Sequence, residues 1–153
     1  MDYTTKKTDR KYMIGIELKT CREDGRAERE IPAHWERFFK EGVAAKIPHK
    51  VSDDTLALYT DYEGDATKPY SMIIGCEVSK IDEIPEGMVA KTIPRARYAI
   101  VKAMGPFPEA LIKTWKKIWT SALKRTYTGD FEVYPAGFHP QNNPEVKLHI
   151  AIK

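Results

Sequence analysis

The chain has 153 residues, of which 42% are hydrophobic and 31% are charged. This length and composition favour one folded domain and argue against wholesale disorder. The formal net charge of +3 is too small to indicate a nucleic-acid-binding protein, because phosphate contacts need clustered cations. No apolar run approaches the roughly 20 residues of a membrane-spanning helix. No signal peptide is recognisable at the N-terminus, so a cytoplasmic protein without membrane contact is expected.

No motif for a metal ion, a cofactor or a serine nucleophile is present. The two cysteines, Cys21 and Cys76, form no CxxC pair and are expected to be free thiols. The four histidines show no metal-ligand spacing. Glycine-rich phosphate-binding motifs and the GxSxG motif are absent. The sequence therefore predicts neither a metal nor a cofactor, and direct DNA binding is not expected.

In chain order, the first half reads as strand, helix, strand, strand. Residues 1–10 are polar and are expected to be flexible. Residues 12–18 alternate in polarity, which is typical of a strand. Pro32 then opens a predicted helix, at a position where its missing N–H costs nothing. Strands are predicted at 55–62 and 70–78, with a loop between them.

The second half repeats that order after one additional strand. The additional strand, at 87–94, is interpreted as an insertion. A strand at 97–104 and a helix with a regular apolar stripe follow, and Gly129 is predicted to end the helix. The last two predicted strands are 130–135 and 145–153.

Three segments match between the halves. They are strand 12–18 with 97–103, the trio Trp35, Phe38 and Phe39 with Trp115, Ile118 and Trp119, and LALY at 56–59 with FEVY at 131–134. The sequence therefore predicts an α+β fold, with a single domain at 11–153. Its two pseudo-symmetric strand–helix–strand–strand units, at about 11–80 and 87–153, are expected to form a sheet with a central ligand cleft.

Glu132 is the most informative position. Along this strand, Glu132 and Tyr134 face one side, while Phe131 and Val133 face the other. The matching residue of the first half is Ala57, so only one unit supplies a carboxylate. A carboxylate among aromatic rings is costly to bury unpaired. Tyrosine hydroxyls, a basic side chain or a cationic ligand could satisfy it. The pattern by itself favours a solvated strand residue or an internal ion-pair partner over a ligand-facing carboxylate.

Aromatic side chains are the other candidates for the cleft. The helical trios are expected to be mostly core, with Trp115 the best placed to reach a groove because it lies near the start of its helix. Tyr59 shares its strand face with Ala57, and tyrosine hydroxyls need partners when buried. Other aromatic residues near the expected groove are Trp35, Tyr98, Tyr134 and Phe138.

The chain resembles the GyrI-like effector-binding domain family, and more narrowly the integron-associated effector-binding proteins. The resemblance runs from about Lys11 to the C-terminus and rests on IPAHWERFF, LALYTDYEGDATKPYSMIIGCEV, IPEGMVAKTIPRARYAIVKAMG, IKTWKKIWTSAL and DFEVYP. It implies two pseudo-symmetric units with an aromatic cleft that binds small, often cationic, drug-like molecules. It also implies that the acidic residue of the FE-x-Y motif, here Glu132, faces this cleft. Strand parity and position in these motifs, rather than the family itself, give Tyr59, Tyr98, Trp115 and Tyr134 as the expected lining residues.

The resemblance leaves three roles open. Many relatives carry this domain as the sensor of a transcription regulator, fused to a DNA-binding domain that is not expected here. The favoured role is a stand-alone protein that binds cationic or amphipathic aromatic compounds. The second is hydrolysis of reactive cyclopropane-containing genotoxins, with Glu132 as general base and Tyr98 or Trp115 as donor. The third is a gyrase-inhibiting protein interaction, whose contact segment the sequence does not reveal.

Overall fold

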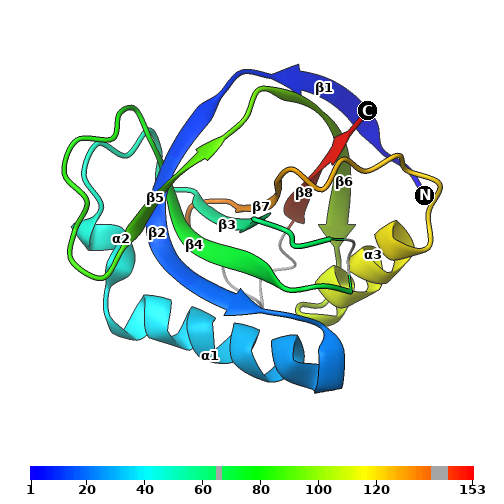
Figure 1. Ribbon diagram of the computed structural model, residues 1–153, viewed down its shortest axis with the longest axis horizontal. Helices are drawn as coiled ribbons and strands as arrows, with labels where there is room; N and C mark the ends of the chain where they lie inside the picture. Colours follow the sequence, from blue (N-terminus) through cyan, green and yellow to red (C-terminus); the bar gives the residue numbers. More distant parts are fainter. Residues whose placement is uncertain (65–66, 139–144) are drawn as a thin grey trace.

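The computed structural model describes residues 1–64, 67–138 and 145–153. Within these residues one antiparallel sheet of eight strands curves strongly, with the two longer helices on the same side of it (Figure 1). The strands are β1 (Thr4–Thr8), β2 (Lys11–Thr20), β3 (Thr55–Thr60), β4 (Tyr70–Val78), β5 (Val89–Ile93), β6 (Ala96–Met104), β7 (Asp130–Tyr134) and β8 (Glu145–Ile152). The helices are α1 (Arg26–Lys40), α2 (Val43–Lys46) and α3 (Glu109–Trp119), with a 3-10 turn, η1 (Glu23–Gly25). The predicted α+β fold is confirmed.

The strand order is symmetric about the boundary between β3 and β7. The order is β1-β6-β8-β7-β3-β4-β2-β5, so β6-β8-β7 on one side mirrors β2-β4-β3 on the other. Ala57 and Glu132, which match between the halves of the sequence, are direct cross-strand partners at this boundary. A pseudo-two-fold axis therefore passes beside Glu132, and both units contribute side chains around it.

The outermost strands differ from expectation. Residues 1–10, expected to be flexible, contain β1, which pairs with β6 of the second unit. The strand interpreted as an insertion is β5, which pairs with β2 of the first unit. Each unit therefore begins with a strand that crosses to the other unit. The polar sequence of β1 concealed this strand, because it is held by backbone hydrogen bonds rather than by an apolar face.

Two predicted helix limits are also wrong. Helix α1 begins at Arg26, so Pro32 lies inside the helix rather than at its start. Helix α3 ends at Trp119, well before Gly129. There the hydroxyls of Thr120 and Ser121 donate to carbonyl oxygens of the last turn, an alternative to continued helix.

The sheet has a buried cluster on each face. The face that carries α1 and α3 holds the larger cluster, which includes Phe38, Ile118 and Leu148. The opposite face holds a smaller cluster that includes Met13 and Phe131. This two-sided burial explains why β4 is apolar along nearly its whole length. No helix within the described ranges is long and apolar enough to cross a bilayer.

Candidate functional site

Glu132 lies in the middle of β7, on the sheet face that carries α1 and α3, and is fully buried. Its Oε2 accepts hydrogen bonds from the Tyr59 hydroxyl at 2.9 Å and from Trp115 Nε1 at 2.6 Å. Its Oε1 accepts one from the Tyr134 hydroxyl at 2.6 Å. Strand β3, helix α3 and strand β7 thus each supply one donor. The sequence-predicted set of Glu132, Tyr59, Trp115 and Tyr134 is brought together.

All three donors to this carboxylate are uncharged. Burial raises the pKa of Glu132, and the hydrogen bonds from Tyr134, Trp115 and Tyr59 oppose that rise. Burial and the nearby Glu132 charge raise the pKa of Tyr59 and Tyr134 well above the usual tyrosine value, so both remain protonated donors. Among the described residues, no Lys, Arg or His side chain forms an ion pair with Glu132. Within the described ranges the carboxylate is therefore solvated by neutral dipoles alone.

Aromatic rings surround the Glu132 network. Trp35 of α1 lies edge-on to Tyr134 with 4.8 Å between ring centroids, and Phe138 lies edge-on to the same ring at 5.1 Å. Trp115 packs against Tyr59 at 5.3 Å. Trp35 and Phe138 therefore belong to the second layer, which contacts Tyr134 rather than the carboxylate. Phe107, which sequence reasoning missed, extends this layer by packing on Phe138 at 5.1 Å.

Tyr98 does not belong to this site. Its ring lies in the cluster on the opposite face of the sheet, edge-on to Phe131 at 5.3 Å, and its hydroxyl donates to the Pro94 carbonyl. Strand parity explains the difference, because Ala99 and Val101 of β6 face the side of Glu132 and Tyr98 therefore faces away. The expected role of Tyr98 in ligand or leaving-group contact has no geometric basis here.

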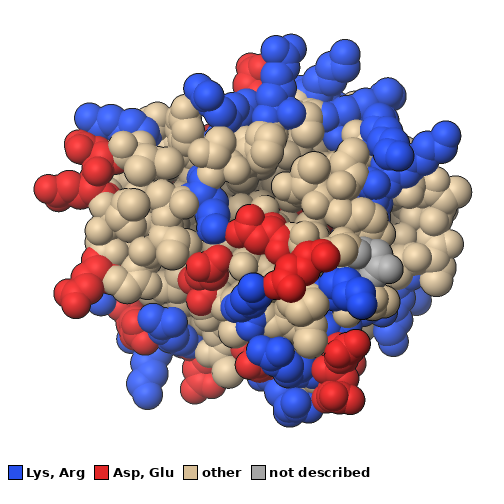
Figure 2. All heavy atoms as spheres, viewed as in Figure 1, with Lys and Arg blue, Asp and Glu red and all other residues tan. Residues whose placement is uncertain are grey.

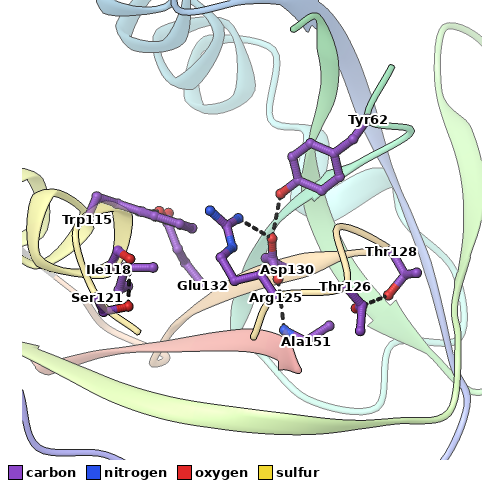
Figure 3. Close-up of polar contacts among 10 residues, drawn as sticks. All are labelled: Tyr62, Trp115, Ile118, Ser121, Arg125, Thr126, Thr128, Asp130, Glu132 and Ala151. Carbon is purple, nitrogen blue, oxygen red and sulfur yellow. Dashed lines mark hydrogen bonds and ion pairs between the residues drawn. The ribbon is translucent and has the colours of Figure 1, made fainter. Parts of the chain in front are cut away.

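A second buried carboxylate lies two residues before Glu132. Asp130 is fully buried, and its Oδ2 accepts hydrogen bonds from Arg125 Nη2 at 2.7 Å and the Tyr62 hydroxyl at 2.6 Å. Its Oδ1 accepts the backbone N–H of Ala151 at 2.8 Å. Figure 3 shows Arg125 and Tyr62 converging on Asp130 while Trp115 lies beside Glu132. Sequence reasoning missed this cluster, although the alternation along β7 places Asp130 on the face of Glu132.

The comparisons with known proteins identify the family of this chain. The family model for integron-associated effector binding proteins matches residues 4–152. The chain belongs to this family. Its relative YobU from Bacillus subtilis (strain 168), named as a transcriptional regulator, is 31% identical over 150 residues, covering 95% of this chain and 94% of YobU.

Two solved structures share the fold of this effector-binding protein. An integron cassette protein from Vibrio cholerae superposes with a TM-score of 0.77 at 24% identity, over 99% of this chain and 95% of that one. SAV2435, solved with bound tetraphenylphosphonium, superposes with a TM-score of 0.82 at 20% identity, over 100% of this chain and 94% of its own. These likenesses confirm the fold.

Access to the Glu132 carboxylate is blocked by the side chains around it. Glu132 has no exposed surface, so a molecule that contacts it must first displace a ring such as Trp115, which is only partly buried. Within the described part of the chain, no three His, Cys, Asp or Glu side chains converge to hold a metal ion.

Proposed function

We propose that this effector-binding protein binds organic cations with aromatic substituents, and that Glu132 is the counter-charge. The observation that carries this proposal is the buried carboxylate with three neutral donors and no basic partner among the described residues. A bound cation would supply the charge that the fold itself does not place beside Glu132.

Electrostatics favour a cation over other ligands. Taking a carboxylate out of water is costly, and neutral donors offset that cost only in part. A cation within a few ångströms interacts more strongly in this low-dielectric setting than in water. The rings of Trp35, Tyr59 and Trp115 would add cation–π attraction of about 0.5–2 kcal/mol each. The tetraphenylphosphonium bound by SAV2435 supports the same ligand class.

Ligand binding and hydrolysis would use the same carboxylate. A general base must contact the water that it activates, whereas a counter-charge acts through space. The full burial of Glu132 therefore supports binding more than turnover. A sensing role, as the name of YobU suggests for that protein, would follow if ligand binding changed the contact with a partner.

Calorimetric titration with tetraphenylphosphonium and tetraphenylborate tests the proposed function. These ions have the same shape and opposite charge, so any difference in affinity reports electrostatics. We expect the cation to bind at least about tenfold more tightly, which corresponds to about 1.4 kcal/mol. Its affinity should rise with pH as Glu132, whose pKa is raised by burial, becomes ionised.

Two outcomes would contradict the proposal. Equal affinity for both ions would mean that shape alone governs binding. If tetraphenylphosphonium does not bind, the protein is not a receptor for aromatic organic cations. Mass spectrometry of the recovered ligand, and of a strained cyclopropane electrophile incubated in parallel, distinguishes binding from hydrolysis. If the electrophile is hydrolysed and the hydrolysis requires Glu132, the protein is a hydrolase rather than a binding protein.

A further inference from the structure

A separate cavity of about 250 Å³ lies where the chain leaves β2 and where the segment after α3 returns to the sheet. Its apolar wall is formed by Ile118, Trp119, Leu123 and Tyr127, and two arginines, Arg22 and Arg125, also line it. Glu132 does not line this cavity. Its three donors, Tyr59, Trp115 and Tyr134, do not line the cavity either, so the cavity lies beside the Glu132 network.

Each arginine of the cavity is stacked on an aromatic ring. The Arg22 guanidinium carbon lies 3.8 Å from the centroid of Trp119, and that of Arg125 lies 4.4 Å from the centroid of Tyr127. Stacking fixes the plane of a guanidinium and leaves its edge free to donate. The Arg125 side chain is only 6% exposed, so its charge acts in a low-dielectric setting.

Charge in and around the cavity is not balanced. Arg125 uses Nη2 to bind Asp130, while its Nε is buried with no acceptor. Asp130 has both oxygens occupied and is fully buried. Arg22 forms no ion pair within the described residues. The pair Arg125–Asp130 is neutral as a unit, so no acidic side chain among the described residues compensates the charge of Arg22.

The two acidic side chains that the structure describes in the adjoining loop, Asp61 and Glu63, do not cancel this charge. Figure 2 shows acidic and basic side chains interspersed over the face seen in Figure 1. Glu63 binds Lys19 at 2.7 Å, and Asp61 binds Lys91 at 2.7 Å. Both acids thus have basic partners outside the cavity.

We propose that this cavity binds a small aromatic carboxylate. Guanidinium groups match the planar carboxylate through paired hydrogen bonds, and the apolar wall would cover one aromatic ring. Pockets for drug-sized ligands are about 300–1,000 Å³, so a cavity of about 250 Å³ suits a single ring. This anion site goes beyond the proposed cation binding and does not depend on it.

The two sites would be neighbours. The Arg125 guanidinium carbon lies 5.9 Å from the ring centroid of Trp115, whose Nε1 donates to Glu132. An anion held at Arg125 would therefore lie one aromatic ring away from the counter-charge of the cation site.

Benzoate titration followed by proton–nitrogen NMR tests the anion site. We expect benzoate to shift the Trp119 indole and Arg125 Nε–H signals in a saturable way, whereas neutral benzamide leaves them in place. Arg22→Gln should weaken benzoate binding by about tenfold, as expected for loss of one charge-assisted contact. Arg10→Gln is the matched control, because Arg10 also lies over an aromatic ring, that of Tyr12 at 5.2 Å, outside the cavity. The Arg10→Gln variant should bind benzoate as tightly as the wild type does.

Three results would overturn the proposal. Equal shifts from benzoate and benzamide would exclude recognition of charge. If Arg10→Gln and Arg22→Gln lose the same affinity for benzoate, the effect comes from general surface charge and not from the cavity. Inorganic phosphate that binds as tightly as benzoate would exclude the aromatic half of the site. None of these results bears on cation binding, since the readouts are the residues of the cavity.

Discussion

Replacing Arg125 with methionine is expected to destabilise the fold by about 3–5 kcal/mol, measured by urea unfolding. The variant keeps most of the side-chain volume but leaves Asp130 fully buried without its positive partner. The Tyr62 hydroxyl and the Ala151 N–H would still donate to Asp130, yet neither carries charge. An unpaired buried carboxylate is among the costliest features that a single substitution can create.

Two further variants distinguish the unpaired charge of Asp130 from the lost packing of the Arg125 side chain as the cause of the destabilisation. Combining Arg125→Met with Asp130→Asn removes both charges and should restore most of the lost stability. Arg22→Met removes an exposed arginine that also stacks on a ring, at 3.8 Å from Trp119, and should cost no more than about 1 kcal/mol. If the double variant is as unstable as Arg125→Met, packing of the arginine rather than its charge stabilises this cluster.

Replacing Gly75 with alanine is expected to cost about 3 kcal/mol, because the added methyl group has no room. Gly75 of β4 lies directly opposite Gly15 of β2. A Cβ atom at Gly75 would lie 2.0 Å from the Ile14 carbonyl oxygen and 2.6 Å from the Gly15 Cα. Both are backbone atoms, so the clash is relieved only if β2 and β4 separate.

Gly64 provides the control for this prediction. The atoms nearest to a Cβ at Gly64 belong to the Lys68 side chain, with Cγ at 2.7 Å, and not to the backbone. Because this side chain can turn away, Gly64→Ala should change the free energy of unfolding by less than about 1 kcal/mol. If thermal or urea unfolding shows equal stability for both variants, β2 and β4 are not held in close approach by the glycine pair.

The centre of the site follows from the sequence because a repeat and strand alternation both point to it. The match of Ala57 with Glu132 placed these two residues at equivalent positions of two units, and in the structure they are cross-strand partners. Alternation put Tyr134 on the face of Glu132, and helical spacing put Trp115 within reach. Strand alternation and helical spacing are local periodicities, and they can be read directly from a sequence.

The errors about Tyr98 and β1 concern features that depend on register between distant strands. Alternation shows that Tyr98 and Ala99 face opposite sides of β6, but only the pairing of β6 with β8 decides which of them shares the face of Glu132. The pairing of β1 with β6 is likewise invisible in a polar segment. Alternation along β7 could have placed Asp130 on the same face as Glu132. Its burial and its pairing with Arg125 could not be predicted, because a buried aspartate has no distinctive sequence pattern.

The most direct test of the central claim is the affinity of tetraphenylphosphonium and tetraphenylborate for wild type and Glu132→Gln, with Glu77→Gln as control. Glu77 is a half-exposed strand carboxylate that pairs with Lys11 at 3.5 Å. If Glu132 is the counter-charge, Glu132→Gln should lose at least about tenfold in affinity for the cation and gain affinity for the anion. The control should leave both affinities unchanged. An equal change for both ions in Glu132→Gln, or no change for either, would show that Glu132 shapes the site without acting as its charge.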